Sequence, residues 1–259
     1  MDLGIRGRRA LLTGASKGIG RACAFAIARE GVELTLVARR EGPLEETAEA
    51  IRRQTGATVA TVAADIATEE GRARALAACP DPDILLNNAG AMPPGDFRDW
   101  GREDWIRAVD LMMLPPIFMM RATVDGMMAR GFGRIVTIAS RSVKIAHAET
   151  GLSNGARSGL VGFTAGLARQ TVRRNVTINT LLPGIIASDA QREHVESLAR
   201  TTGRGFEVLW AERAAQNPAG RYGEPDEVGA YFAFLVSARA GFITGQNLLM
   251  DGGHFPGTL

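Results

Sequence analysis

The amino-acid sequence predicts an α/β fold with a doubly wound parallel sheet in a single domain, 1–259, and three observations carry this prediction. Short apolar runs alternate with helical patterns along almost the whole chain. The runs are apolar throughout, as expected of strands that helices cover on both faces of a sheet. The length of 259 residues, of which 46% are hydrophobic and 22% charged, suits one domain with a substantial core.

The first half of the chain holds the clearest alternation. The run RALLTG (9–14) is a candidate buried strand, and the helix expected over 18–30 carries small apolar residues and Phe25 on one face. Three pairs of strand and helix follow, and in each pair an apolar run is followed by the spacing of apolar residues that is typical of a helix. They comprise strands over 32–38, 58–64 and 83–90, and helices over 43–54, 68–78 and 102–129.

The second half repeats the pattern with one interruption. We expect strands over 133–140, 175–184 and 247–253, and helices over 152–173 and 224–237. The segment 188–220 breaks the alternation and is mostly helical in pattern, with Phe206, Leu209 and Trp210 as apolar anchors. Its place beyond the C-terminal end of a strand favours a lid over a pocket, and a surface helical pair packed on the core is the alternative.

Composition excludes several classes of protein. The net charge of +2 and pI of 8.8, without a basic stripe between aromatic residues, argue against nucleic-acid binding. Cys23 and Cys79 have neither disulfide nor metal-ligand spacing and look like small apolar residues in a reducing compartment. The N-terminus lacks the apolar core of a signal peptide, and the apolar run 111–120 is too short to span a bilayer. We expect a cytoplasmic protein with a small-molecule substrate and no nucleic-acid, membrane or metal partner.

The octapeptide TGASKGIG (13–20) stands between the first strand and the first helix. Its three glycines allow a tight turn and a close approach of the backbone to a pyrophosphate. The helix N-terminus adds free N–H groups and the positive end of the helix dipole. This strand–turn–helix context favours a dinucleotide site over a tight turn without a ligand.

Together with five later motifs, this turn resembles the short-chain dehydrogenase/reductase family nearly end to end. The later motifs are NNAG (87–90), GRIVTIAS (133–140), PGIIAS (183–188), and the C-terminal pair GRYGEPDEVG (220–229) and ITGQNLLMDGG (243–253). The resemblance implies a Rossmann-type fold and a bound nicotinamide dinucleotide. It also implies which residues bind that cofactor: Gly14, Ser16, Lys17, Gly18, Ile19, Gly20, Asp65, Ile66, Asn88, Ala89, Gly90, Arg157, Pro183, Gly184, Ile186 and Ser188.

The end of the second strand favours NADP(H) over NAD(H). That strand ends in LVARR, with Arg39 and Arg40 where a carboxylate would accept the ribose hydroxyls of NAD. Arginine can pair with a 2′-phosphate, and Lys17 adds a second positive group. The alternative is that both arginines begin a solvated loop.

The resemblance also implies a set of four catalytic residues, of which this chain keeps one. In the family, a tyrosine exchanges the substrate proton and a lysine four residues later supports it. A serine binds the substrate carbonyl, and an asparagine on the long helix supports a proton relay. Ser140 matches the serine, but Ser153, Arg157 and Asp110 stand at the other three positions.

The missing tyrosine and lysine are not displaced along the chain. The two tyrosines, Tyr222 and Tyr231, lie within or beside other motifs, and no lysine follows Lys144. Arg157 keeps a positive charge but cannot pass on a proton. Ser140 and Ser153 can form a pocket with two donors for a developing oxyanion.

The proton therefore needs another donor. The loop after Ser140 holds Lys144, His147 and Glu149, and Lys144 is the preferred candidate because this chain otherwise uses arginine for positive charge. Solvated side chains are the alternative for all three. Asp110 is a further candidate, or forms a buried ion pair with Arg157 as structural support.

These features predict an NADP(H)-dependent oxidoreductase that reduces a carbonyl or an imine by a non-standard proton route. The alternatives are a protein that binds NADP(H) without redox turnover, and non-redox acid/base chemistry on the same scaffold. We also expect a homo-oligomer, a tetramer, because the family pairs through long helices and the run 111–120 holds more methionine than one core face needs. Core packing is the alternative for those methionines.

Overall fold

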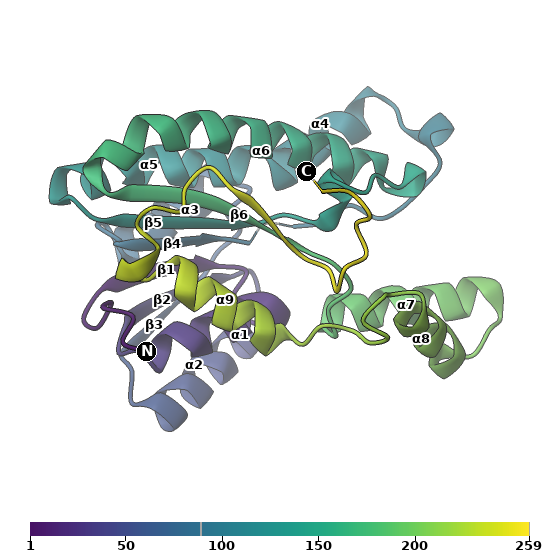
Figure 1. Cartoon of the computed structure of the whole chain (residues 1–259), viewed down its shortest axis with the longest axis horizontal. Helices are drawn as coiled ribbons and strands as arrows, with labels where there is room; N and C mark the ends of the chain where they lie inside the picture. Colours follow the sequence, from purple (N-terminus) through teal and green to yellow (C-terminus); the bar gives the residue numbers. More distant parts are fainter. Residues whose placement is uncertain (89, 259) are drawn as a thin grey trace.

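The structure is a computed structural model that describes residues 1–88 and 90–258, and it confirms the predicted α/β fold. Seven strands form one sheet in the order β3-β2-β1-β4-β5-β6-β7, and all neighbouring strands are parallel (Figure 1). The strands are β1 (Arg9–Thr13), β2 (Glu33–Ala38), β3 (Val59–Ala63), β4 (Ile84–Asn87), β5 (Gly133–Ile138), β6 (Val176–Pro183) and β7 (Asn247–Met250). The strand order reverses between β1 and β4, and the crevice at the carboxyl ends of these strands is where ligands bind in such sheets.

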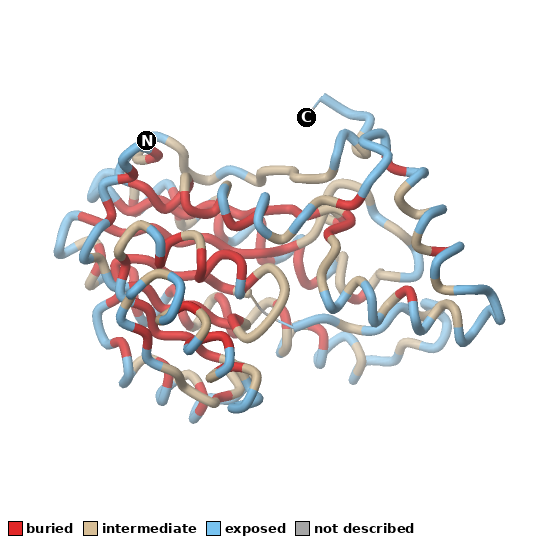
Figure 2. The backbone as a smooth tube through the Cα atoms, turned by 90° about the horizontal axis from the view of Figure 1, so that it is seen from below, coloured by how far each residue is buried: buried red, intermediate tan, exposed pale blue. Residues whose placement is uncertain are grey.

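Helices cover both faces of the sheet, so the central strands are buried on both sides, while the edge strands β3 and β7 are partly exposed (Figure 2). One face is covered by α1 (Gly18–Ala28), α2 (Glu41–Thr55) and α9 (Pro225–Leu235). The other face is covered by α3 (Glu69–Ala78), α4 (Arg102–Met112), α5 (Leu114–Arg130) and α6 (Gly151–Thr171). Short 3₁₀ turns η1 (Phe97–Asp99), η2 (Arg141–Val143), η3 (Ala148–Thr150), η4 (Val172–Arg174) and η5 (Ala238–Ala240) lie in the connections.

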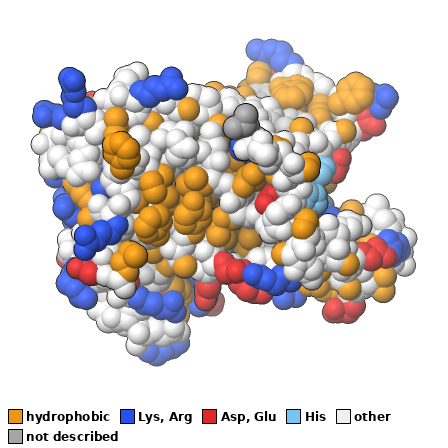
Figure 3. Space-filling model, viewed as in Figure 1, with side chains coloured by type: hydrophobic (Ala, Val, Ile, Leu, Met, Phe, Trp, Pro, Cys, Tyr) orange, Lys and Arg blue, Asp and Glu red, His pale blue; other side chains and the backbone are white. Residues whose placement is uncertain are grey.

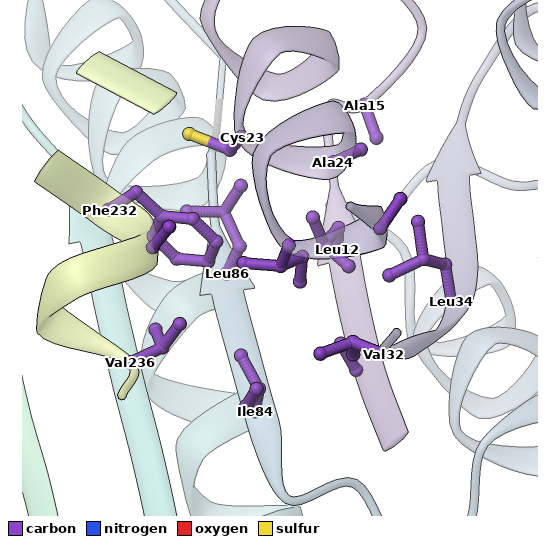
Figure 4. Packing of buried hydrophobic residues seen from close by; sticks show 14 of the residues in the cluster. Leu12, Ala15, Cys23, Ala24, Val32, Leu34, Ile84, Leu86, Phe232 and Val236 are labelled. Carbon is purple, nitrogen blue, oxygen red and sulfur yellow. The ribbon is translucent and has the colours of Figure 1, made fainter. Parts of the chain in front are cut away.

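The core on the α1–α9 face packs Phe232 of α9 against Leu86 of β4 and Cys23 of α1 (Figure 4). The two helices approach closely at Gly229, where a Cβ would lie 2.7 Å from the carbonyl oxygen of Ala22. Both cysteines are buried and free, as the sequence predicts. Burial raises the pKa of the Cys23 thiol, so this sulfur behaves as an apolar group.

The single helix that the sequence predicts over 102–129 is two helices, and this prediction is wrong. α4 ends at Met112 and α5 begins at Leu114. Pro115 and Pro116 occupy the first turn of α5, where a missing backbone N–H leaves no hydrogen bond unmade. Inside a continuous helix the same prolines would remove hydrogen bonds, so α4 ends before them.

The segment 188–220 forms two helices, α7 (Asp189–Thr202) and α8 (Phe206–Ala215), that stand away from the sheet (Figure 1). Val195 and Leu209 are their buried residues. Two aromatic residues of α8 stack with Tyr222, which follows the helix. The Trp210 ring lies 5.5 Å from that of Phe206 and 3.9 Å from that of Tyr222. Among the described residues, no helix is long and apolar enough to cross a membrane.

Candidate functional site

The glycine-rich turn forms a cradle in which side chains have no room. Gly14 and Gly18 adopt positive φ angles of 62° and 56°. A Cβ at Gly14 would lie 2.4 Å from the carbonyl oxygen of Asn88, and a Cβ at Gly20 would lie 2.1 Å from that of Gly14. Lys17 at the start of α1 makes no side-chain cap, so the first N–H groups of the helix stay available. This arrangement fits a pyrophosphate.

The turn after β4 holds this cradle in place. Asn88 donates its side-chain N–H to the carbonyl oxygen of Gly14 at 3.1 Å, and its backbone N–H to Thr13 Oγ1 at 2.9 Å. Ala89, the next cofactor residue predicted from the sequence, lies outside the described residues. The motifs TGASKGIG and NNAG thus meet at the point where the strand order reverses.

The two arginines after β2 lie where the sequence predicts a phosphate contact. Arg39 and Arg40 are exposed, and neither forms an ion pair among the described residues. Lys17 was also expected to contact the phosphate, but its Nζ pairs with Glu193 Oε1 of α7 at 2.6 Å. The nearby Asp65 carboxylate accepts the N–H of Ala67 at 3.0 Å and so shapes the turn that carries Ile66.

The loop after β6 reaches from the sheet to α7. Gly184 lies so close to the turn after β7 that its Cβ would meet the Cα of Asp251 at 2.7 Å. Ile186 pairs with Gly223 in an isolated bridge, and Ser188 caps α7 by accepting the N–H of Gln191 at 3.4 Å. The glycine turn touches this loop, since a Cβ at Gly18 would lie 3.4 Å from the Cβ of Ser188. The loop that follows Pro183 therefore lies beside the glycine cradle.

Arg157 stands at the centre of the site, buried with 8% of its surface exposed. Its guanidinium donates to Ser153 Oγ at 3.1 Å, to the Ile138 carbonyl at 3.2 Å and to the Gly90 carbonyl at 2.9 Å. It therefore joins the end of β5 to the turn after β4. Burial lowers the pKa of Arg157 to about 10, which leaves the group charged at neutral pH.

The predicted ion pair between Asp110 and Arg157 is wrong. Asp110 is exposed on α4, and no ion pair of Arg157 occurs among the described residues. Met112 is fully buried instead, in a cluster with Leu152 and Ala156 of α6. The side of α4 that faces α6 is therefore apolar.

Ser140 and Ser153 each keep a hydroxyl proton for a substrate. Ser140 follows β5 and accepts the N–H of Ser142 at 3.1 Å. Ser153 accepts the Nε–H of Arg157 at 3.1 Å. Each oxygen accepts a hydrogen bond, and each hydroxyl still has its own proton to donate.

The loop after Ser140 faces the C-terminal segment 251–258. Lys144 Nζ lies 5.5 Å from the centre of the Phe255 ring, and Arg141 Nη1 lies 3.0 Å from His254 Nδ1. His147 is partly buried with Nε2 unpartnered, and Glu149 is exposed. Sequence reasoning did not select Arg141, Arg213, His194 and His254, because these residues belong to no local motif.

The chain is similar to known proteins along almost its whole length. A family model described as enoyl-(acyl carrier protein) reductase matches residues 14–254. A 3-oxoacyl-(acyl-carrier-protein) reductase of Vibrio cholerae is 31% identical over 257 residues, which cover 98% of this chain and 99% of the relative. An acetoacetyl-CoA reductase of Rhizobium meliloti is 33% identical over 250 residues, which cover 96% of this chain and 98% of the relative. The L-sorbose reductase of Gluconobacter frateurii, solved with NADPH and L-sorbose, is 31% identical with a TM-score of 0.94 and 100% of both chains covered. The chain therefore belongs to the short-chain dehydrogenase/reductase family of oxidoreductases.

Proposed function

We propose that this protein is an NADPH-dependent reductase of a carbonyl group in a small organic substrate. The observation that carries the proposal is the glycine cradle beside Asn88, with Arg39 and Arg40 exposed after β2 and without an ion pair to any residue that the structure describes. The NADPH complexes of the L-sorbose reductase and of an actinorhodin polyketide ketoreductase support the same cofactor. When bound, NADPH supplies the hydride, so the protein has to orient the substrate and supply a proton.

Ser140 and Ser153 would bind the substrate oxygen. Both hydroxyls have a free proton, and two donors aimed at one oxygen stabilise the negative charge that develops there. Arg157 orients Ser153 and adds a fixed positive charge, but it stays protonated and so cannot be the acid. We infer that the proton comes from Lys144 on the adjoining loop, because a lysine, unlike an arginine, can serve as a general acid.

The segment 188–220 would act as a lid over this site. The ion pair of Lys17 with Glu193 ties the glycine turn to α7, and Ser188 connects the loop after β6 to the same helix. Both contacts join the protruding helices to cofactor-binding segments rather than to the core.

A role without redox turnover is the second candidate function, and one observation favours it. All three nitrogen atoms of the Arg157 guanidinium donate to protein oxygens, as a purely structural residue would do. Transfer of the cofactor's hydride to a carbonyl compound distinguishes the two functions. A structural or sensor protein binds NADPH and leaves it reduced.

The variant Arg39→Asp should weaken NADPH binding about 10- to 150-fold more than NADH binding, because one charge-assisted contact is lost and a repulsion is added. The matched control is Arg53→Asp, an exposed arginine at the other end of α2. Dissociation constants from cofactor fluorescence give the comparison. Equal weakening of both cofactors would mean that Arg39 does not contact the 2′-phosphate.

We also propose that the protein is a homotetramer that pairs through α5 and α6. The methionine pattern is not a reason for it, because Met112, Met119, Met120 and Met127 are fully buried in the chain's own core. The support is the α6 surface instead. Phe163 is 39% exposed there, and Gly162 has open space where a side chain would be.

Light scattering at micromolar concentration should give four times the mass of the chain. Phe163→Glu should lower that mass, because a charge would be buried at the pairing surface. The control Phe242→Glu changes a fully exposed phenylalanine outside α5 and α6. A monomeric wild-type protein would contradict this proposal.

A further inference from the structure

We propose that the substrate carries an oxyanion, a carboxylate or a phosphate, and that Arg141, Arg213 and His254 bind it next to the reacting carbonyl. The inference deepens the proposed reductase function and rests on it. The binding chamber would lie between the loop 141–150, the α7–α8 pair and the C-terminal segment 251–258. We call these three segments the chamber walls.

The chamber walls bring basic groups together from distant parts of the sequence. Arg141 immediately follows Ser140, and its Nη1 lies 3.0 Å from His254 Nδ1. All three histidines of the chain, at 147, 194 and 254, lie on these walls. Figure 3 shows histidine side chains on the wall of the concavity between the body of the protein and the protruding helices.

The basic groups are near enough to repel one another. The pKa of Arg141 is lowered, chiefly by burial and then by the charge of Arg213, with Asp251 opposing. The pKa of His194 is lowered by burial and by Arg213, with Glu149 opposing. Placing like charges close together raises the free energy of the site, and a bound anion would lower it.

Protein carboxylates offset the positive charge of this chamber only in part. Among residues 1–88 and 90–258, neither Arg141 nor Arg213 forms an ion pair. The Asp251 carboxylate is engaged elsewhere, since it accepts the backbone N–H groups of Gly253 at 3.1 Å and Phe255 at 2.9 Å. Glu149 is exposed.

Buried donors on the same walls also lack partners. Among the described residues, Arg213 Nε and His147 Nε2 are buried without a hydrogen bond. A buried donor without a partner costs free energy that an incoming acceptor recovers. An oxyanion is the ligand that satisfies both the charge and the donors, because guanidinium groups bind carboxylate and phosphate in a bidentate manner.

The binding should be linked to proton uptake. Burial lowers the pKa of His254, followed by Arg141, with Asp251 opposing and His147 adding to the effect. A bound anion would raise this pKa, so the complex would hold more protons than the free protein. Affinity for the anion should therefore rise as the pH falls through the range between the bound and free pKa values. Lys144 lies on the same wall, with its Nζ 5.5 Å from the centre of the Phe255 ring.

The test compares a 3-oxo acid with its neutral ester, using acetoacetate and methyl acetoacetate as substrates with NADPH. The ratio of kcat/KM for acid over ester should exceed one in the wild-type protein. It should fall about ten- to hundred-fold in Arg141→Gln and in Arg213→Gln. Arg200→Gln, an exposed arginine on α7, should keep the wild-type ratio. Thermal unfolding of each variant shows whether it is folded. A ratio of one or less in the wild-type protein overturns the inference, while ester turnover still supports the reductase function.

Calorimetry gives an answer that does not depend on turnover. Acetoacetate and inorganic phosphate are titrated separately into the complex with NADP⁺, at pH about 6 and about 8, in buffers of different ionisation enthalpy. Tighter binding at the lower pH with proton uptake, both lost in Arg141→Gln, supports the chamber. Binding of acetoacetate alone identifies a carboxylate, and binding of phosphate alone identifies a phosphorylated substrate. If neither anion binds, the inference is wrong whether or not the protein reduces the ester.

Discussion

Replacing Lys144 with arginine or with methionine is expected to lower kcat by a factor on the order of 10²–10⁴. Ser153 and Arg157 occupy the positions where the resemblance implies a proton-donating tyrosine and its lysine, and Arg157 holds its proton. Lys144 lies on the loop that begins at Ser140 and is one of two lysines in the chain. The measurement is kcat against pH for both variants under saturating NADPH.

The two variants control for each other. Arginine keeps the positive charge and methionine removes it, but neither can donate a proton at neutral pH. Equal losses in both variants would identify proton donation as the missing function. If Lys144→Arg keeps the wild-type rate and pH profile, Lys144 is not the donor, and His147 or a bound water has that role.

Replacing Arg157 with methionine is expected to lower the free energy of unfolding by about 2–6 kcal/mol. The change leaves the carbonyl oxygens of Gly90 and Ile138 buried without their donor, at about 1–3 kcal/mol each. For a chain of this size, the melting temperature should fall by roughly 5–20 °C. The melting temperature of Arg157→Lys should lie between those of Arg157→Met and the wild-type protein, because one ammonium cannot reach all three acceptors as the planar guanidinium does.

The control for this series is Arg169→Met, an exposed arginine in the last turn of the same helix. It should change the melting temperature little, since surface substitutions are usually within about 0.5 kcal/mol. Scanning calorimetry on all three variants provides the comparison. An Arg157→Met protein as stable as Arg169→Met would contradict the role assigned to Arg157 in joining β4 to β5.

The sequence predicts the sheet and the glycine cradle well because both depend on local rules. Gly14 and Gly20 have no room for a Cβ, so the residue type itself reports the close contact. The apolar runs likewise predict strands buried on both faces, because a strand covered by helices on both sides needs apolar residues at every position. The strand ends are less well predicted, since motifs such as NNAG extend past β4 into the turn that holds the cradle.

Predictions that needed the orientation of a helix or a long-range contact were less successful. A buried ion pair with Arg157 was one of the two roles expected for Asp110, but α4 presents Met112 inward and leaves Asp110 exposed. Lys17 was expected to face a phosphate, and its ammonium pairs with a glutamate that lies 176 positions along the chain. No local pattern predicts either contact, because tertiary packing decides both.

The chamber walls illustrate the same limit. Arg141, Arg213 and His254 come from a loop, a helix and the C-terminal segment, and their spacing in the sequence has no meaning as a motif. The scarcity of histidine was visible in the composition, with three in the chain. Their common location required the fold.

The most direct test of the central claim is to follow the transferable hydrogen of the cofactor. The protein is incubated with NADPH that carries deuterium at the transferable position of the nicotinamide, together with a panel of 2-oxo and 3-oxo acids and their esters. Mass spectrometry then detects the label in the products. A reductase places one deuterium on the former carbonyl carbon of at least one product, at a rate that falls in Ser140→Ala by about 10²–10³. Stoichiometric binding of NADPH with no labelled product from any compound would contradict the claim and favour a role without redox turnover.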